Sequence, residues 1–130
     1  MDKIVSIPLP ARSPKKTSKS KQERACVNRL VKAIQKNSSF VHIHIDRDSG
    51  STRHTSSGWD FLITTCGHTV FCEAKMEKGK LTDWQKFTQA QIEATRTPYR
   101  VVRFSDDGKK FYVDGGDAVP IDAALAGDFL

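Results

Sequence analysis

The feature that most constrains the fold of this chain is a pair of short apolar segments on either side of a tight turn. Residues 59–65 and 69–76 are rich in β-branched and aromatic side chains, which favour extended strands. The turn between them is Cys66-Gly67-His68, and a central glycine is typical of a hairpin connection. We therefore predict a β-hairpin whose second strand lies inside a larger sheet.

The second strand of this hairpin carries two charged residues on one face. Alternation along a strand places Glu73 and Lys75 on the same face as Phe71. The opposite face is apolar and consists of Val70, Cys72 and Ala74. Asp60 lies near the start of the preceding antiparallel strand, so the turn should bring it roughly opposite the end that carries Glu73 and Lys75.

Two carboxylates and an ammonium group at one end of a hairpin suit the hydrolysis of phosphodiester bonds. Hard cations such as Mg²⁺ prefer carboxylate and carbonyl oxygens as ligands. A bound Mg²⁺ polarises a phosphate and lowers the pKa of a bound water, and a nearby lysine stabilises the charge that develops on phosphorus. The spacing alone also fits a plainer interpretation, in which Glu73 and Lys75 form an exposed ion pair and Asp60 is a surface residue.

The remaining elements indicate an α/β domain with a central mixed β-sheet flanked by helices, in the order αβββαβ. A first helix is predicted over residues 20–36, where an apolar stripe recurs at helical spacing and Ser20 with Glu23 fits a capping box. A second is predicted over residues 82–96, with Thr82 and Gln85 as another capping pair. Strands are expected at residues 40–45, 100–104 and 110–113, and a short helix within residues 117–130.

Charge and composition favour a nucleic acid as the partner. The net charge is +6 over 130 residues, and lysine and arginine bound to phosphate release counterions. Residues 1–19 combine prolines, serines and lysines without periodicity, so we expect a flexible basic tail, followed by one domain over residues 20–130. We expect three reduced cysteines, no membrane segment and a cytoplasmic location, which would be the host cytoplasm if a phage encodes the chain.

The residues of the hairpin resemble the signature of the PD-(D/E)XK nuclease superfamily. Gly58-Trp59-Asp60 followed by Glu73-Ala74-Lys75 is similar to its (P)D…(D/E)xK motif, although Trp59 stands where the family commonly has proline. The segment over residues 78–85, the helix after it and the strand over residues 99–103 look like the VRR-NUC branch, which includes Holliday junction resolvase-like proteins. The branch's name-giving arginines are a second departure, because Val101-Val102-Arg103 offers only one arginine, with Arg100 just before it.

This resemblance implies a restriction-endonuclease-like domain and gives individual residues roles. Asp60 and Glu73 would be metal ligands, together with the main-chain carbonyl of Ala74, and Lys75 would position the attacking water. Glu23 matches an acidic residue that the superfamily often places on its first helix, and a capping role with Ser20 is the equal alternative. Gln85 matches a helix glutamine near the active site, with a capping role beside Thr82 as its alternative.

We therefore expect a Mg²⁺-dependent DNA endonuclease, with Mn²⁺ as a substitute. The basic tail, the loop over residues 46–57 and the segment after the Glu73 strand would grip the DNA backbone. The residues expected to contact DNA are Lys15, Lys16, Lys19, Arg47, Arg53, His54, Lys78 and Lys80. The resemblance also implies that the enzyme acts on branched or junction DNA and that it forms a homodimer. The alternatives are a catalytically inactive nucleic-acid-binding module of the same fold, and an assembly protein with a basic tail.

Overall fold

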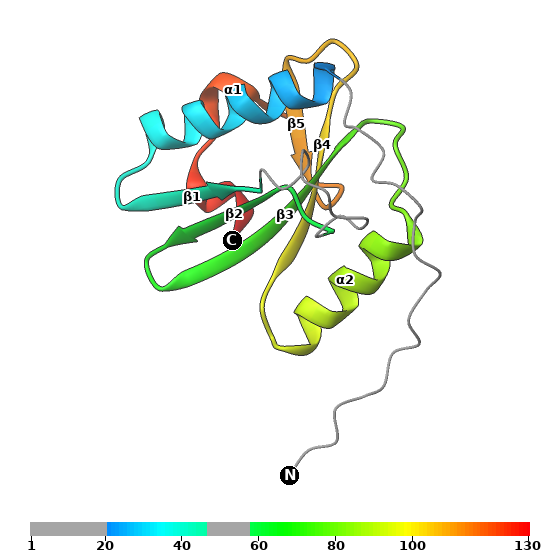
Figure 1. Cartoon of the computed structure of the whole chain (residues 1–130). Coiled ribbons are helices and arrows are strands. Elements are labelled where there is room, and N and C mark those ends of the chain that lie inside the picture. The colour runs from blue at the N-terminus through cyan, green and yellow to red at the C-terminus, as the bar shows by residue number, and fades with distance from the viewer. Residues whose placement is uncertain (1–20, 47–57) are drawn as a thin grey trace.

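The structure, a computed structural model, describes residues 21–46 and 58–130. In this part of the chain, six strands form one mixed sheet in the order β1-β2-β3-β4-β5-β6, with two α-helices packed against it (Figure 1). The elements are α1 (Lys21–Asn37), β1 (Val41–Ile45), β2 (Phe61–Thr65), β3 (His68–Met76), α2 (Asp83–Ala94), β4 (Tyr99–Phe104), β5 (Lys110–Val113) and β6 (Val119–Pro120). The predicted α/β class with a mixed sheet and flanking helices is confirmed.

The β2–β3 hairpin forms as predicted, with a tighter turn. Thr65 pairs with His68, so the turn contains Cys66 and Gly67 alone, and His68 is the first residue of β3. Cys66 and Gly67 have φ values of 48° and 80°, and positive φ at both central residues is the signature of a type I′ turn. The predicted three-residue turn was wrong because this turn type matches the right-handed twist of the flanking strands.

The centre of the sheet is a parallel pair. β3 and β4 run side by side in the same direction, with Phe71 opposite Tyr99 and Lys75 opposite Arg103. Parallel neighbours need a crossover connection, and α2 supplies it. The other four strand pairs are antiparallel. Tyr99 and Arg103 therefore share the face of the sheet that carries Phe71, Glu73 and Lys75.

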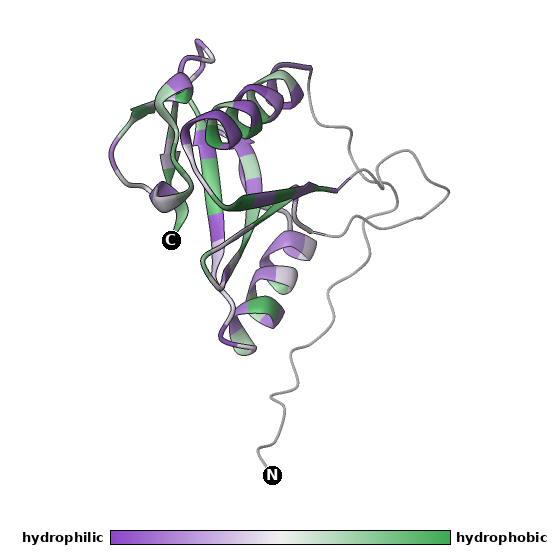
Figure 2. Ribbon diagram, turned by 90° about the vertical axis from the view of Figure 1, so that its left-hand side faces the viewer, coloured by the Kyte–Doolittle hydropathy of each residue, from purple (hydrophilic) through white to green (hydrophobic). Residues whose placement is uncertain are grey.

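The hydrophobic core lies between the sheet and α1. The predicted stripe on the first helix is buried and consists of Val27, Leu30, Val31 and Ile34. It faces the apolar side of β3, namely Val70, Cys72 and Ala74, which are all fully buried. The two helices lie on opposite sides of the sheet, and hydrophilic and hydrophobic residues alternate along both of them (Figure 2). The face of β3 that carries Glu73 is therefore the one that α2 covers.

The C-terminal segment differs from the prediction of a short helix over residues 117–130. It begins with strand β6 and continues as two short 3₁₀ helices, η2 (Ile121–Ala123) and η3 (Ala126–Phe129). An α-helix running through Pro120 is disfavoured, because proline lacks the backbone N–H and clashes with the preceding turn, and Pro120 instead precedes η2 as its N-cap. Phe129 is fully buried and stacks on Phe111 with ring centroids 5.5 Å apart. Tertiary packing of this side chain therefore determines the local conformation.

Two predictions concern segments outside the described residues. These are the basic tail over residues 1–19 with the Ser20 cap, and the loop that follows β1. Among the residues that the structure does describe, no helix is long and apolar enough to cross a membrane.

Candidate active site

A β-bulge at the start of β2 positions Asp60. Phe61 lies opposite Cys72 in the ladder, and the backbone N–H of Asp60 also donates to the Cys72 carbonyl oxygen at 2.8 Å. Two consecutive residues therefore face one, which is the arrangement of a bulge and redirects the side chain at that point. The Asp60 Oδ2 atom accepts a hydrogen bond of 2.7 Å from the backbone N–H of Ala74. The carboxylate of Asp60 thus lies beside the Glu73-Ala74-Lys75 segment, where the sequence predicted it.

Gly58 fixes the approach to Asp60. Its φ is +83°, and a Cβ atom built there would lie 2.2 Å from the Thr88 Oγ1 atom on α2. Neither the backbone conformation nor the space admits a side chain, so this position requires glycine. The Gly58 carbonyl oxygen also accepts a hydrogen bond of 2.5 Å from the Tyr99 hydroxyl on β4. Trp59, between Gly58 and Asp60, packs edge-on against Phe71 with ring centroids 5.3 Å apart.

Glu73 is buried on the α2 side of the sheet and has a specific partner there. The residue is only 1% exposed, although a carboxylate is costly to remove from water unless it is paired, hydrogen-bonded or bound to a cation. The Gln85 side-chain amide on α2 donates a short hydrogen bond to Glu73 Oε1. The buried acid is thus held by a buried amide on the facing helix, and such a buried hydrogen bond fixes the positions of both groups.

Gln85 also caps α2, so it combines the predicted capping role with a contact to Glu73. Its Oε1 atom accepts from the Thr82 backbone N–H at 2.8 Å, and its own backbone N–H donates to the Thr82 hydroxyl at 3.1 Å. This reciprocal pair is a complete capping box. The amide oxygen of Gln85 therefore fixes the start of the helix, while its amide nitrogen donates a hydrogen bond to Glu73. The cap orients the group that contacts the acid.

Lys75 lies at the end of β3 under the connection to α2. Its aliphatic stem lies close to Gly79, where a Cβ atom would come within 3.3 Å of the Lys75 Cδ atom. Arg103, opposite Lys75 in the ladder, donates through Nη1 to the carbonyl oxygens of Gly79 and, at 3.4 Å, Met76. The connection is thus held close over the lysine by an arginine from the neighbouring strand.

Glu23 reaches the same end of β3 from the first turn of α1. Its Oε1 atom accepts from the Met76 backbone N–H at 3.3 Å, and the residue is partly buried. This contact places an acidic group beside the residue that follows Lys75. The alternative capping role with Ser20 is not described, because Ser20 lies outside the described residues.

The electrostatics of Tyr99 indicate that both carboxylates lie near one hydroxyl. Burial raises the pKa of the Tyr99 hydroxyl far above its usual value, and the negative charges of Glu73 and Asp60 raise it further. The phenol therefore remains protonated and serves as a donor throughout the neutral range. Tyr99 is 1% exposed, so its hydroxyl is shielded from bulk water.

The donor set of Asp60, Glu73 and the Ala74 carbonyl fits a hard divalent cation in chemical type. Carboxylate and carbonyl oxygens are the ligands that Mg²⁺ takes, usually with waters completing its shell. Each carboxylate has two oxygens, so the bonds from Ala74 and Gln85 do not exhaust its capacity as an acceptor. Over residues 21–46 and 58–130, no cluster of three or more His, Cys, Asp or Glu side chains could hold a metal ion. Any cation here would therefore rely on two carboxylates, a carbonyl and water.

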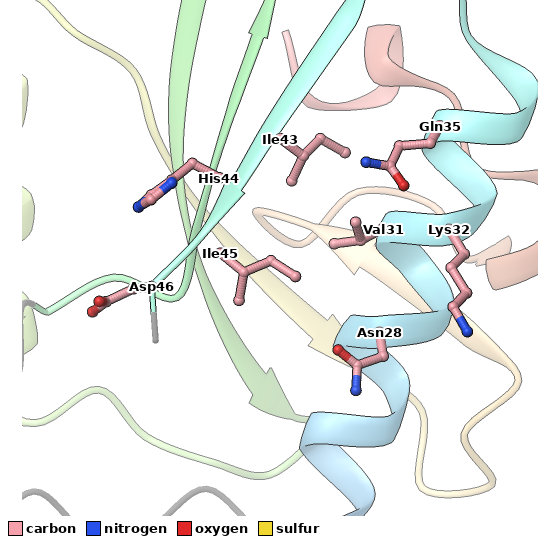
Figure 3. Close-up of a pocket in the computed structure, with 8 residues that line it drawn as sticks. All are labelled: Asn28, Val31, Lys32, Gln35, Ile43, His44, Ile45 and Asp46. Atoms are coloured by element: carbon pink, nitrogen blue, oxygen red, sulfur yellow. The ribbon is translucent and has the colours of Figure 1, made fainter. Parts of the chain in front are cut away.

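A separate groove of about 910 Å³ lies between α1 and β1. Figure 3 shows Val31, Ile43 and Ile45 turned toward one another in this groove, with His44 and Asp46 on the far side of β1. The groove contains none of Asp60, Glu73 or Lys75. Its end is nevertheless close to the site, because the Asp46 backbone N–H donates to the Asp60 carbonyl at 2.8 Å.

The structure brings together five of the residues that the sequence singled out. Asp60, Glu73, Lys75, Gln85 and Glu23 all lie at or beside the same end of β3. Lys78 and Lys80 are exposed on the connection that follows it. The other predicted DNA contacts, Lys15, Lys16, Lys19, Arg47, Arg53 and His54, lie outside the described residues.

Sequence reasoning missed the contribution of Tyr99 and the clamp formed by Arg103. Both lie on β4, and their roles depend on its parallel register with β3. A tyrosine at the start of a buried strand was the available signal, because a buried hydroxyl needs a partner.

No protein-family model matches the sequence, and no curated protein matches it.

Proposed function

We propose that this chain is a metal-dependent endodeoxyribonuclease with a restriction-endonuclease-like fold of the PD-(D/E)XK type, similar to the VRR-NUC branch. One observation carries the proposal. The Asp60 carboxylate is hydrogen-bonded to the backbone of Ala74, within the segment that also presents the buried Glu73 and the partly buried Lys75. Neither a binding module nor an assembly protein needs two carboxylates and a lysine at the end of one hairpin.

Asp60, Glu73 and the Ala74 carbonyl would hold the cation, which we propose to be Mg²⁺ with Mn²⁺ as a substitute. When bound, such an ion supplies a Lewis acid for the phosphate and lowers the pKa of a coordinated water. Gln85, on α2, fixes the orientation of the Glu73 carboxylate through its hydrogen bond. Partners of this kind, outside the metal's own ligands, typically change metal affinity or activity by about 10- to 100-fold.

Lys75 would act on the water and the phosphate. Its ammonium group can orient the attacking water and stabilise the negative charge that develops on the phosphoryl oxygens. The water oxygen forms a bond to phosphorus as a phosphorus–oxygen ester bond breaks. The products are a phosphomonoester and a free hydroxyl, and the water's proton passes to solvent or to the leaving oxygen. Glu23, beside Met76, would assist from the edge of this site.

DNA is the proposed substrate, and its backbone would pass over the connection between β3 and α2. The exposed Lys78 and Lys80 lie there, next to Lys75. The net charge of +6 favours such a polyanion. Selectivity for branched or junction DNA and action as a homodimer rest on the family resemblance alone.

The deciding experiment is cleavage of supercoiled plasmid and of branched synthetic DNA in Mg²⁺, Mn²⁺ or EDTA. Parent protein is compared with Asp60→Asn, Glu73→Gln and Lys75→Met, which keep side-chain volume close to the original. Lys86→Met, an exposed lysine on α2, is the matched control. We expect metal-dependent cutting that the first three substitutions reduce more than about 100-fold, since they remove groups that act directly rather than through a partner.

The rival functions give different results in the same experiment. Tight, salt-dependent binding without cleavage, unchanged by the three substitutions, would identify an inactive binding module. No affinity for DNA beyond that of a protein of similar charge would favour an assembly role. Cleavage that persists in EDTA would contradict the role of a metal.

A further inference from the structure

We infer that Tyr99 is a positioning residue, whose hydroxyl fixes the Gly58 carbonyl and thereby sets the Asp60 carboxylate beside Glu73. The inference rests on the proposed function, because it assigns a role in the same site. It assigns Tyr99 no contact with the reacting atoms. Tyr99 acts through the short segment from Gly58 to Asp60.

The contact is direct and buried. The Tyr99 hydroxyl donates to the Gly58 carbonyl oxygen at 2.5 Å, from a side chain that is 1% exposed. In such an environment a hydrogen bond is stronger than at the surface, and a carbonyl left without its donor is correspondingly costly. The bond joins residues 41 positions apart, so it is a tertiary constraint and no part of a local turn.

The segment from Gly58 to Asp60 is held at three further points. Gly58 packs against Thr88 of α2 so closely that no Cβ fits, and Trp59 packs on Phe71 of β3. The Asp60 backbone joins the Cys72 carbonyl through the bulge. Only one residue separates the carbonyl that Tyr99 holds from the proposed metal ligand. A displacement of the Gly58 carbonyl should therefore displace the Asp60 carboxylate by a similar distance.

Tyr99 is well placed for this task because it stands on the central strand pair. It begins β4 opposite Phe71, two residues before the position that pairs with Glu73. A group on a paired strand is held more precisely than one on a loop. Tyr99 therefore relates the Asp60 segment to the strand that carries Glu73, and the two proposed ligands keep a fixed separation.

The test is Mn²⁺ binding, which needs no cleavage. The chain has two tryptophans, so a Trp84→Phe background leaves Trp59, next to Asp60, as the sole reporter of quenching by paramagnetic Mn²⁺. Tyr99→Phe is compared in that background with Tyr112→Phe, its matched control, because Tyr112 is the other tyrosine and donates to Glu77 at 2.8 Å. Asp60→Asn identifies the part of the quenching that depends on the site.

We expect Tyr99→Phe to raise the Mn²⁺ concentration for half-maximal quenching by about 10-fold or more, and Tyr112→Phe to change it less than about twofold. In metal-free buffer, the near-ultraviolet circular dichroism of Trp59 should also change in Tyr99→Phe and stay constant in Tyr112→Phe. A tyrosine that merely fills the core would lower the unfolding temperature without moving the half-saturation point of the folded protein.

The outcomes separate this inference from the proposed function. If Asp60-dependent Mn²⁺ binding is present and Tyr99→Phe leaves it unchanged, the positioning role is wrong while the metal site stands. If the parent shows no Asp60-dependent binding, both the metal-dependent function and this inference are overturned. If Tyr99→Phe weakens binding but the parent cuts no DNA, the positioning role is upheld and the nuclease function is wrong.

Discussion

The two faces of β3 bury different chemistry. On the α1 side, Val70, Cys72 and Ala74 are fully buried in a continuous apolar cluster. On the α2 side, Glu73 is nearly as buried, and it accepts a hydrogen bond from the Gln85 amide. The first face is stabilised by removing apolar area from water, which is non-directional. The second depends on the position of individual donors and acceptors.

The two faces should therefore respond differently to substitution, one in stability and the other in function. A core of apolar side chains tolerates substitutions that conserve volume. A buried polar network loses much of its value when one member is removed, since the remaining groups are left without their partners. We therefore expect the α1 face to govern stability and the α2 face to govern activity.

The largest effect is expected for Leu30→Ala on the α1 side. Leu30 is fully buried, and truncating such a leucine costs about 2–5 kcal/mol through lost transfer free energy and the cavity left behind. Chemical denaturation measures this change, while DNA cleavage per folded molecule should stay within about twofold of the parent. If Leu30→Ala instead lost cleavage per folded molecule and kept its stability, the division between the two faces would be contradicted.

Gly58→Ala should be nearly as damaging and should affect both properties. A non-glycine residue at a left-handed φ costs about 1–2 kcal/mol, and forcing atoms into a packed site costs about 1–3 kcal/mol more. Gly67→Ala is the matched control, because its φ of +80° is similar and no atom lies within 4 Å of the added Cβ. The free energy of unfolding should fall about 2–5 kcal/mol for Gly58→Ala, against about 1–2 kcal/mol for the control. Equal losses in the two variants would show that the contact with Thr88 is unimportant.

Much of the fold could be predicted from sequence because its signals are local. The apolar stripe of α1, the Thr82–Gln85 capping box and the alternation along β3 each depend on residues a few positions apart. The hairpin then brings Asp60 to the end that carries Glu73 and Lys75, because the turn sets the register of both strands.

What the sequence did not reveal depends on tertiary contacts. The bulge at Asp60 and the bond from Tyr99 to Gly58 follow from how β4 and α2 pack on the hairpin. The C-terminal segment was predicted as one short helix but forms β6 and two short 3₁₀ helices, because the burial of Phe129 against Phe111, far from it in sequence, determines its conformation. The chemical roles of Asp60, Glu73 and Lys75 were predicted from the groups at one end of the hairpin together with the family resemblance, and the cleavage experiment tests them.

A smaller effect should separate the two roles of Gln85. Thr82→Ala removes the hydroxyl that caps the Gln85 backbone N–H but keeps the Thr82 backbone N–H that holds the Gln85 side chain, so it should lower stability by about 1 kcal/mol and leave cleavage nearly unchanged. Gln85→Ala removes the cap and the contact with Glu73, and should also lower cleavage by about 10- to 100-fold. Denaturation and cleavage assays on both variants measure the two effects. Equal cleavage in the two variants would reduce Gln85 to a capping residue.

The smallest effect is a loss of stability at high pH, to which buried weak acids on both faces contribute. Burial raises the pKa of the Cys72 thiol well above its usual 9.0, and that of the Tyr99 hydroxyl above its usual 10.0. Between those usual values and the raised ones, the unfolded chain releases protons that the folded chain keeps, so the free energy of unfolding falls as pH rises. The stabilisation is complete below pH 9, and Cys72 should account for a loss of about 1 kcal/mol between pH 9 and 10.

Urea denaturation of three variants across this range tests the assignment. Cys72→Ala should flatten the fall above pH 9, and Tyr99→Phe should flatten it above pH 10, because each removes the acid concerned. Val70→Ala is the control, since Val70 is as buried as Cys72 on the same face of β3 but carries no titratable group. It should lower the curve at every pH without altering its slope. A fall that survives unchanged in both Cys72→Ala and Tyr99→Phe would place the responsible acids elsewhere. Neither Cys72 nor Tyr99 would then explain the fall in the free energy of unfolding at high pH.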